Sequence, residues 1–112
     1  MAYDADLANR IRELIAADAG LTEVKMFGGL AFLLSGNMAV AVSSQGGLLL
    51  RVDPRQTEAL LAKPHAAPFV MRGRAMDGWL RVAPEGVTTK TQLRRWVDRG
   101  VRYARTLPPK QA

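Results

Sequence analysis

The sequence predicts an α+β domain with the element order α-β(3)-α-β(2)-α, in which an antiparallel sheet and the helices packed against it form two layers. Both ends of the chain show the apolar spacing of amphipathic helices, and short apolar runs separated by Gly-containing turns lie between them. The length of 112 residues suits one domain, and an apolar content of 48% favours a packed core. We expect a single domain at residues 3–108 and a short C-terminal tail at residues 109–112.

The first helix is predicted over residues 5–18. Asp4 is a typical N-cap residue, and Gly20 is typical of the position just beyond a helix end. Apolar side chains recur at a spacing of three and four residues, which places them on one helix face. They are Leu7, Ile11, Leu14 and Ile15.

Turn sequences rich in Gly, Ser and Asn separate the next apolar runs, which predicts an antiparallel meander of three strands. The strands are residues 22–34, 38–42 and 48–52. Gly28 and Gly29 interrupt the first strand, and a glycine pair inside a strand usually marks a bulge or a bend. We expect this bend to place Met26 and Phe32 in the core.

A short second helix is predicted after Asp53 and Pro54, because Asp is a good N-cap and Pro is tolerated at the first helical position. Pro64 ends this helix. Two further strands are predicted at residues 69–71 and 79–82, with an irregular segment before and between them.

The last helix is predicted from the capping box of Thr89 and Gln92 to about Leu107. One face is apolar and consists of Leu93, Trp96, Val97, Gly100, Ala104 and Leu107. The opposite face is basic and consists of Arg94, Arg95, Arg99, Arg102 and Arg105. Guanidinium groups suit phosphate oxygens, so this face is a candidate contact for nucleic acid or another anion. The alternative is that this face is only solvated. Twelve of the sixteen basic residues of the chain are Arg, so a general compositional bias toward Arg would also place arginines here.

The charge is also uneven along the chain. Residues 1–56 carry five Lys or Arg and six Asp or Glu, whereas residues 57–112 carry eleven and four. The N-terminus has acidic residues where a signal peptide has basic ones, and the apolar runs are too short to cross a bilayer. We therefore expect a cytoplasmic protein with no membrane partner.

The residues indicate no catalytic or metal-binding constellation, and we expect no enzyme, no cofactor and no small-molecule substrate. The chain has no Cys, which excludes thiol catalysis and Cys-based zinc sites. His65 is the only histidine, and the carboxylates are scattered singly. An enzyme would need a pocket in which His65, Arg72 or Arg74 meets carboxylates.

Several strings resemble the N-terminal domain of the TfoX/Sxy family. The most specific is Lys25-Met26-Phe27-Gly28-Gly29 followed by Phe32, and Gly36-Asn37-Met38-Ala39 and Gly78-Trp79 support it. The resemblance covers about residues 3–108 and implies a small bacterial regulatory domain with helices packed on an antiparallel sheet. The regulators that give the family its name carry a second, C-terminal domain, whereas this sequence stops at Ala112. We therefore expect a stand-alone N-terminal domain.

Together these features predict a non-enzymatic regulatory or protein-interaction domain, like that of competence regulators. We expect its partner to be another protein or a second copy, with a homodimer formed through an exposed apolar sheet surface or helix. The alternative is a nucleic-acid-binding accessory protein that uses the basic face of the last helix. The Met-Phe-Gly-Gly string is expected to be structural.

Overall fold

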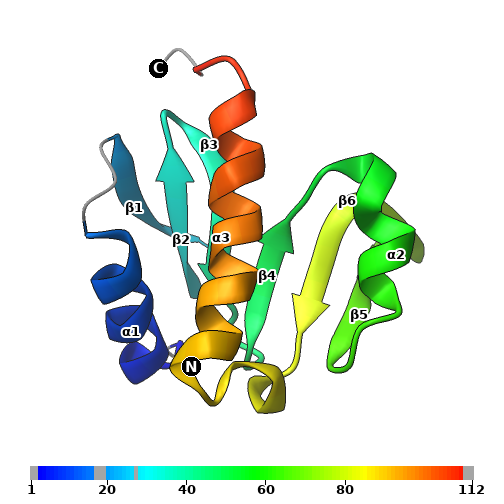
Figure 1. Cartoon of the computed structure of the whole chain (residues 1–112), viewed down its shortest axis with the longest axis horizontal. Coiled ribbons are helices and arrows are strands. Elements are labelled where there is room, and N and C mark those ends of the chain that lie inside the picture. The colour runs from blue at the N-terminus through cyan, green and yellow to red at the C-terminus, as the bar shows by residue number, and fades with distance from the viewer. Residues whose placement is uncertain (1–2, 17–19, 27, 110–112) are drawn as a thin grey trace.

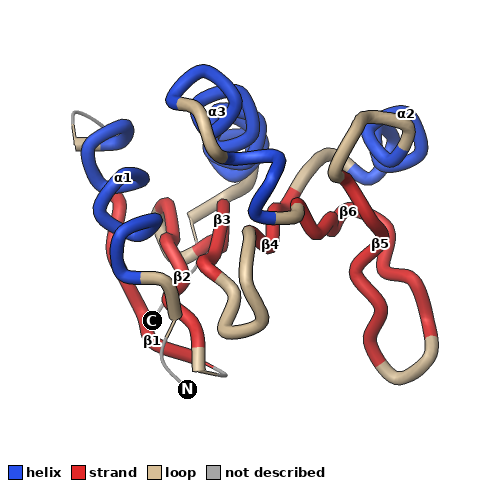
Figure 2. The backbone as a smooth tube through the Cα atoms, turned by 90° about the horizontal axis from the view of Figure 1, so that it is seen from below, coloured by secondary structure: helices blue, strands red, loops and turns tan. Residues whose placement is uncertain are grey.

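Three helices pack on one face of a six-stranded antiparallel sheet and leave the other face uncovered (Figure 1 and Figure 2). The computed structural model describes residues 3–16, 20–26 and 28–109. The helices are α1 (Ala5–Ile15), α2 (Thr57–Leu61) and α3 (Lys90–Thr106), with short 3-10 turns η1 (Pro54–Gln56) and η2 (Pro84–Val87). The strands are β1 (Leu21–Met26), β2 (Gly29–Leu34), β3 (Asn37–Val42), β4 (Leu48–Arg51), β5 (Ala66–Met71) and β6 (Arg74–Val82).

The sheet has the strand order β1-β2-β3-β4-β6-β5, and every neighbouring pair is antiparallel. The predicted α+β class is therefore confirmed. The sheet has one strand more than predicted, because residues 22–34 form the hairpin β1–β2 and not one bent strand. Met26 lies opposite Gly29 in this hairpin, and Gly28 has a φ of 78°, a left-handed conformation that glycine adopts without steric cost.

The last two strands are longer than predicted. β5 and β6 form one hairpin whose turn is only Arg72 and Gly73, both with positive φ. The prediction of an irregular segment here was wrong. Pro68 argues against a strand in the sequence, because proline cannot donate a hydrogen bond to a neighbouring strand. Since β5 is an edge strand, it tolerates a residue without an N–H group.

The predicted starts of the first and last helices are confirmed at the atomic level. The second α-helix begins later than predicted, because Asp53 caps the 3-10 turn η1 and α2 follows from Thr57 without a side-chain cap. The carboxylate of Asp4 accepts a hydrogen bond of 3.1 Å from the amide of Leu7 and caps α1. Thr89 and Gln92 form a reciprocal capping box at the start of α3. These bonds satisfy amides that have no partner within the helix.

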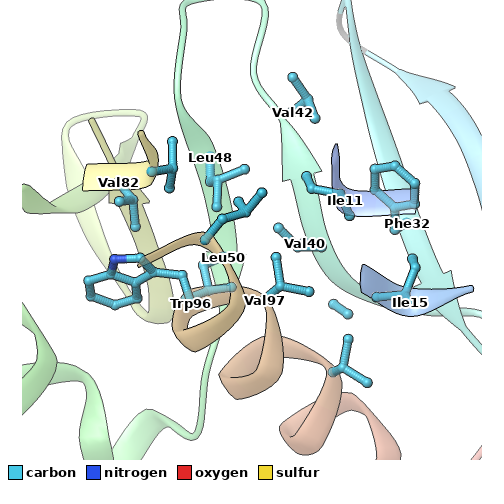
Figure 3. Packing of buried hydrophobic residues seen from close by; sticks show 14 of the residues in the cluster. Ile11, Ile15, Phe32, Val40, Val42, Leu48, Leu50, Val82, Trp96 and Val97 are labelled. Atoms are coloured by element: carbon cyan, nitrogen blue, oxygen red, sulfur yellow. The ribbon is translucent and has the colours of Figure 1, made fainter. Parts of the chain in front are cut away.

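The hydrophobic core lies between the helices and the covered face of the sheet (Figure 3). Phe32, Val40 and Leu50 are almost fully buried there, and α3 packs over β3 and β4. Gly100 allows this close approach, because a Cβ atom added to it would overlap the carbonyl oxygen of Ala39. None of the helices in the described part of the chain is long and apolar enough to cross a membrane.

Candidate functional site

The uncovered face of the sheet carries a hollow of about 430 Å³, here called the open-face groove. Its lining comes from every strand of the sheet and from the loop between β3 and β4. Along β4 the side chains alternate between the two faces: Leu48 and Leu50 are buried in the core, whereas Leu49 is half-buried and lines the groove. The sheet is therefore apolar on both faces at its centre.

Small side chains form the floor of the groove. Ala41 of β3 lines it and lies opposite Leu49 of β4, and Gly29 of β2 lines it as well. Because alanine and glycine are small, they leave space between the larger side chains of the lining.

A β-bulge brings one of these larger side chains to the groove. Phe32 pairs with Val40, but the next residue, Leu33, pairs with Met38, so Ala39 is an extra residue on β3. The bulge keeps Val40 in the core and turns Met38 to the uncovered face, where it lines the groove.

Four of the five methionines of the chain line the groove. They are Met26, Met38, Met71 and Met76. Methionine is unbranched and polarisable, so a surface rich in it adapts to different partner shapes. Met71 and Met76 are 46% and 38% exposed, which is unusual for large apolar side chains on a folded domain.

Aromatic side chains form the groove wall on the β5–β6 hairpin. The rings of Phe69 and Trp79 are 6.3 Å apart between centroids and tilted by 52°. The guanidinium carbon of Arg51 lies 5.3 Å from the Trp79 ring and 5.8 Å from the ring of Tyr103 on α3. These cation–π contacts link the wall to the helical layer.

One cationic group lines the groove within the described part of the chain. Arg81 donates a hydrogen bond of 2.6 Å from Nη1 to Oε1 of Gln45, and Nη2 lies 3.5 Å from Oγ of Ser43. Both acceptors are neutral, and no described carboxylate lines the groove. The site is thus an apolar hollow with a positioned, uncompensated positive charge beside the β3–β4 loop.

The predicted basic face of α3 lies in the helical layer, on the other side of the sheet from the groove. Four of its arginines are exposed and Arg99 is half-buried, with its guanidinium carbon 4.8 Å from the Trp96 ring. The exposed members are Arg94, Arg95, Arg102 and Arg105. Asp98 forms no ion pair with Arg94 or Arg102 in the described structure.

The residues of the Met-Phe-Gly-Gly string divide between several places. Phe32 is in the core as predicted, but the placement of Met26 in the core was wrong. Met26 is half-buried and lines the groove, because it follows Val24 onto the uncovered face. Lys25 is exposed on β1, and Phe27 lies outside the described residues.

The two glycines of that string act through the backbone. Gly28 provides the turn of the β1–β2 hairpin, and Gly29 is buried so tightly that an added Cβ atom would overlap the carbonyl oxygen of Val42. Gly29 also lines the groove. The string therefore shapes one end of the groove as well as the hairpin.

The residues considered for catalysis lie elsewhere. His65 is exposed between α2 and β5, and Arg72 and Arg74 are exposed at the turn of the β5–β6 hairpin. None of the three lines the groove. Within the described ranges, no group of three or more His, Asp and Glu residues is placed to hold a metal ion.

The sequence reasoning did not identify the groove. Met71, Met76, Trp79 and Arg81 lie on two strands that were predicted too short, and their common face depends on register. A usable signal was present, since four methionines fall within strands of an otherwise Leu- and Val-rich sheet.

Comparison with known proteins adds one result to this geometry. The family model of the TfoX N-terminal domain matches residues 13–104, a range that contains all six strands and the residues that line the groove. Neither a curated protein nor a solved structure matches the chain. The match covers far more than half of the sequence, and the chain belongs to the TfoX N-terminal domain family.

Proposed function

We propose that this chain is a non-enzymatic regulatory domain, like that of competence regulators, which acts by binding a partner protein in the open-face groove. The observation that carries the proposal is the methionine-lined hollow on a sheet face that the described helices leave uncovered. Family membership supports a regulatory role of this kind. The lining also favours binding over chemistry, because it contains neither the histidine nor a described carboxylate.

The dimensions of the apolar surface favour a protein segment as the occupant. The apolar surface extends from the hollow along the β5–β6 hairpin, where Met71 and Met76 are 46% and 38% exposed. A small ligand enclosed in the hollow would leave this hairpin surface in water. A peptide segment that enters the hollow and lies along the hairpin would cover both.

The charge of the groove favours a particular kind of segment. Arg81 is held by Gln45 and Ser43, so its guanidinium is positioned before any partner arrives. Bringing an apolar surface against it without an anion would bury an unpaired charge, which is costly. We therefore propose that the segment presents apolar side chains to the methionines and an Asp or Glu carboxylate to Arg81.

The experiment is a capture from lysate of the source cells under nuclease treatment, with three forms of the protein. The groove variant is Met71→Lys/Met76→Lys, and the matched control is Arg95→Glu/Arg102→Glu on the exposed face of α3. The captured protein is then purified and titrated against each form. We expect the wild type and the α3 control to bind with similar affinity and the groove variant to bind at least about tenfold more weakly. Equal binding by the groove variant would refute the proposal.

A second candidate function uses the basic face of α3 to bind nucleic acid. It is favoured by the exposed guanidinium groups of Arg94, Arg95 and Arg102, which form no ion pair in the described structure. The logarithm of the affinity for duplex or single-stranded nucleic acid should then fall linearly with the logarithm of the salt concentration. Arg95→Glu/Arg102→Glu should abolish this binding, while Met71→Lys/Met76→Lys should leave it unchanged. No binding at low salt removes this candidate.

A further inference from the structure

The two edges of the sheet differ in a way that bears on self-association. The outer edge of β5 contains Pro68, which has no N–H group, and its register with β6 shifts between Pro68 and Val70. Both features hinder the addition of another strand. The β1 edge has neither feature: its register with β2 is continuous from Leu21 to Met26, and residues 22–25 are exposed. Among the described strands, β1 pairs with β2 alone.

We propose that two copies of the chain pair through β1 in antiparallel orientation, with Val24 of each copy on the two-fold axis. This pairing is isologous, because each copy contributes the same strand. It aligns residues 22–26 of one copy with residues 26–22 of the other, and it needs no rearrangement of the sheet. The proposal is independent of the groove partner proposed above, and either of them stands if the other fails.

The charges on β1 select this register. Glu23 lies opposite Phe32 and Lys25 opposite Leu30, so both project from the helix-covered face of the sheet. A two-fold axis at Glu23 would place two carboxylates directly opposite each other, and an axis at Lys25 would place two ammonium groups opposite each other. An axis at Val24 instead places each Glu23 opposite the Lys25 of the other copy, and cross-strand pairs of opposite charge are favourable.

The charged groups of Glu23 and Lys25 can both pair with a second copy. Arg12 on α1 donates hydrogen bonds of 2.6 and 2.7 Å to the two carboxylate oxygens of Glu23, which fixes the carboxylate beside the edge. Each oxygen keeps a free lone pair after this contact. The ammonium group of Lys25 forms no hydrogen bond or ion pair in the described structure. It is therefore available to the Glu23 carboxylate of a second copy.

The other face of β1 also matches itself in this register. Val24 and Met26 lie on the uncovered face, where Val24 is 42% exposed. The axis at Val24 brings the two Val24 side chains together and places Thr22 opposite Met26 of the other copy. Because directly opposite residues of antiparallel strands share a face, both open-face grooves would lie on the same side of one continuous sheet.

The absence of native cysteine allows a direct test by disulfide trapping. Opposite residues of antiparallel strands have Cα atoms about 4.5–5.5 Å apart, which suits a disulfide. Val24→Cys should give a covalent dimer on mild oxidation. The matched control is Val70→Cys, an exposed valine on the other edge strand, which should stay monomeric. Thr22→Cys alone should not cross-link, whereas a mixture of Thr22→Cys with Met26→Cys should.

A charge exchange tests the register without cysteines. Lys25→Glu alone and Glu23→Lys alone each place like charges opposite each other, and we expect the dissociation constant of the dimer to rise about tenfold or more. Mixing the two variants restores two attractive pairs and should restore the dimer. Sedimentation measures the masses, and circular dichroism checks the folds. The proposal is overturned if Val24→Cys cross-links no faster than Val70→Cys, or if the mixture remains as dissociated as its components.

Discussion

The amide of Gly78 donates a buried hydrogen bond of 2.8 Å to the hydroxyl of Thr57, and this bond ties β6 to the start of α2. Gly78 has a φ of 86° and lies in the stretch of β6 where the register with β5 shifts. The next residue, Trp79, forms part of the groove wall. A polar bond in the helical layer thus fixes the backbone that carries an aromatic side chain on the opposite face.

Thr57→Val should destabilise the fold, because it leaves the buried Gly78 amide without an acceptor. The expected loss is about 1–3 kcal/mol in the free energy of unfolding, measured by urea denaturation. Thr57→Ser keeps the hydroxyl and should recover most of the loss. If Val and Ser variants unfold at the same urea concentration, the bond does not contribute to stability.

Gly100→Ala should also lower stability, although alanine is the better helix former. The added Cβ would overlap the carbonyl of Ala39, so α3 must move away from β3 at a cost of about 1–3 kcal/mol, against a helix-propensity gain of about 1 kcal/mol. Thermal unfolding followed by circular dichroism measures the difference. Asp98→Ala, an exposed change on the same helix, serves as the control. A Gly100→Ala protein as stable as the wild type would show that the contact is not close.

The Arg12–Glu23 ion pair makes stability depend on pH on the acid side. The hydrogen bond from Arg12 lowers the pKa of the Glu23 carboxyl below its ordinary value. A carboxyl whose pKa is lower in the folded protein than in the unfolded protein stabilises the fold at pH values above its unfolded-state pKa. This stability is lost as the pH falls through its folded-state pKa. The advantage of the wild type over Glu23→Gln should therefore be present at neutral pH and disappear on acidification.

Denaturation midpoints of wild type and Glu23→Gln, measured from neutral pH down to about pH 3, check this expectation. The difference at neutral pH should be small, because both side chains of the pair are more than a third exposed. A difference that grows as the pH falls would contradict the assigned sign.

Arg81 should determine which partner segments enter the groove. Arg81→Glu places a carboxylate opposite the Asp or Glu that the partner is proposed to carry. The two negative charges repel, and the affinity for the partner should fall by about tenfold or more. Exchanging the partner's acidic residue for Arg should restore binding to Arg81→Glu and weaken binding to the wild type. Isothermal titration with the four combinations measures the coupling. If the two changes act additively, Arg81 does not contact that acid.

Much of the fold was predictable because its signals are local. The N-caps at Asp4 and Thr89, and the amphipathic spacing of α1 and α3, depend on residues within one or two turns of each other. The turn at Gly28 was misjudged because a bend and a hairpin both need a glycine with positive φ.

The groove was not predictable because it depends on contacts between distant segments. Leu48, Leu49 and Leu50 read as one apolar run, and only the packing of α3 decides which of their faces is the core. Met38 reaches the groove through a one-residue bulge, and Arg81 reaches its acceptors on the β3–β4 loop 36 residues earlier in the chain. Neither relationship is visible in local spacing.

Amide hydrogen exchange of the protein with and without its captured partner tests the central proposal most directly. Binding in the open-face groove should protect β5, β6 and the β3–β4 loop, where the groove wall and Arg81 lie, and should leave exchange along α3 unchanged. Protection confined to α3, with no change in the β5–β6 hairpin, would contradict the proposal and place the partner on the basic face.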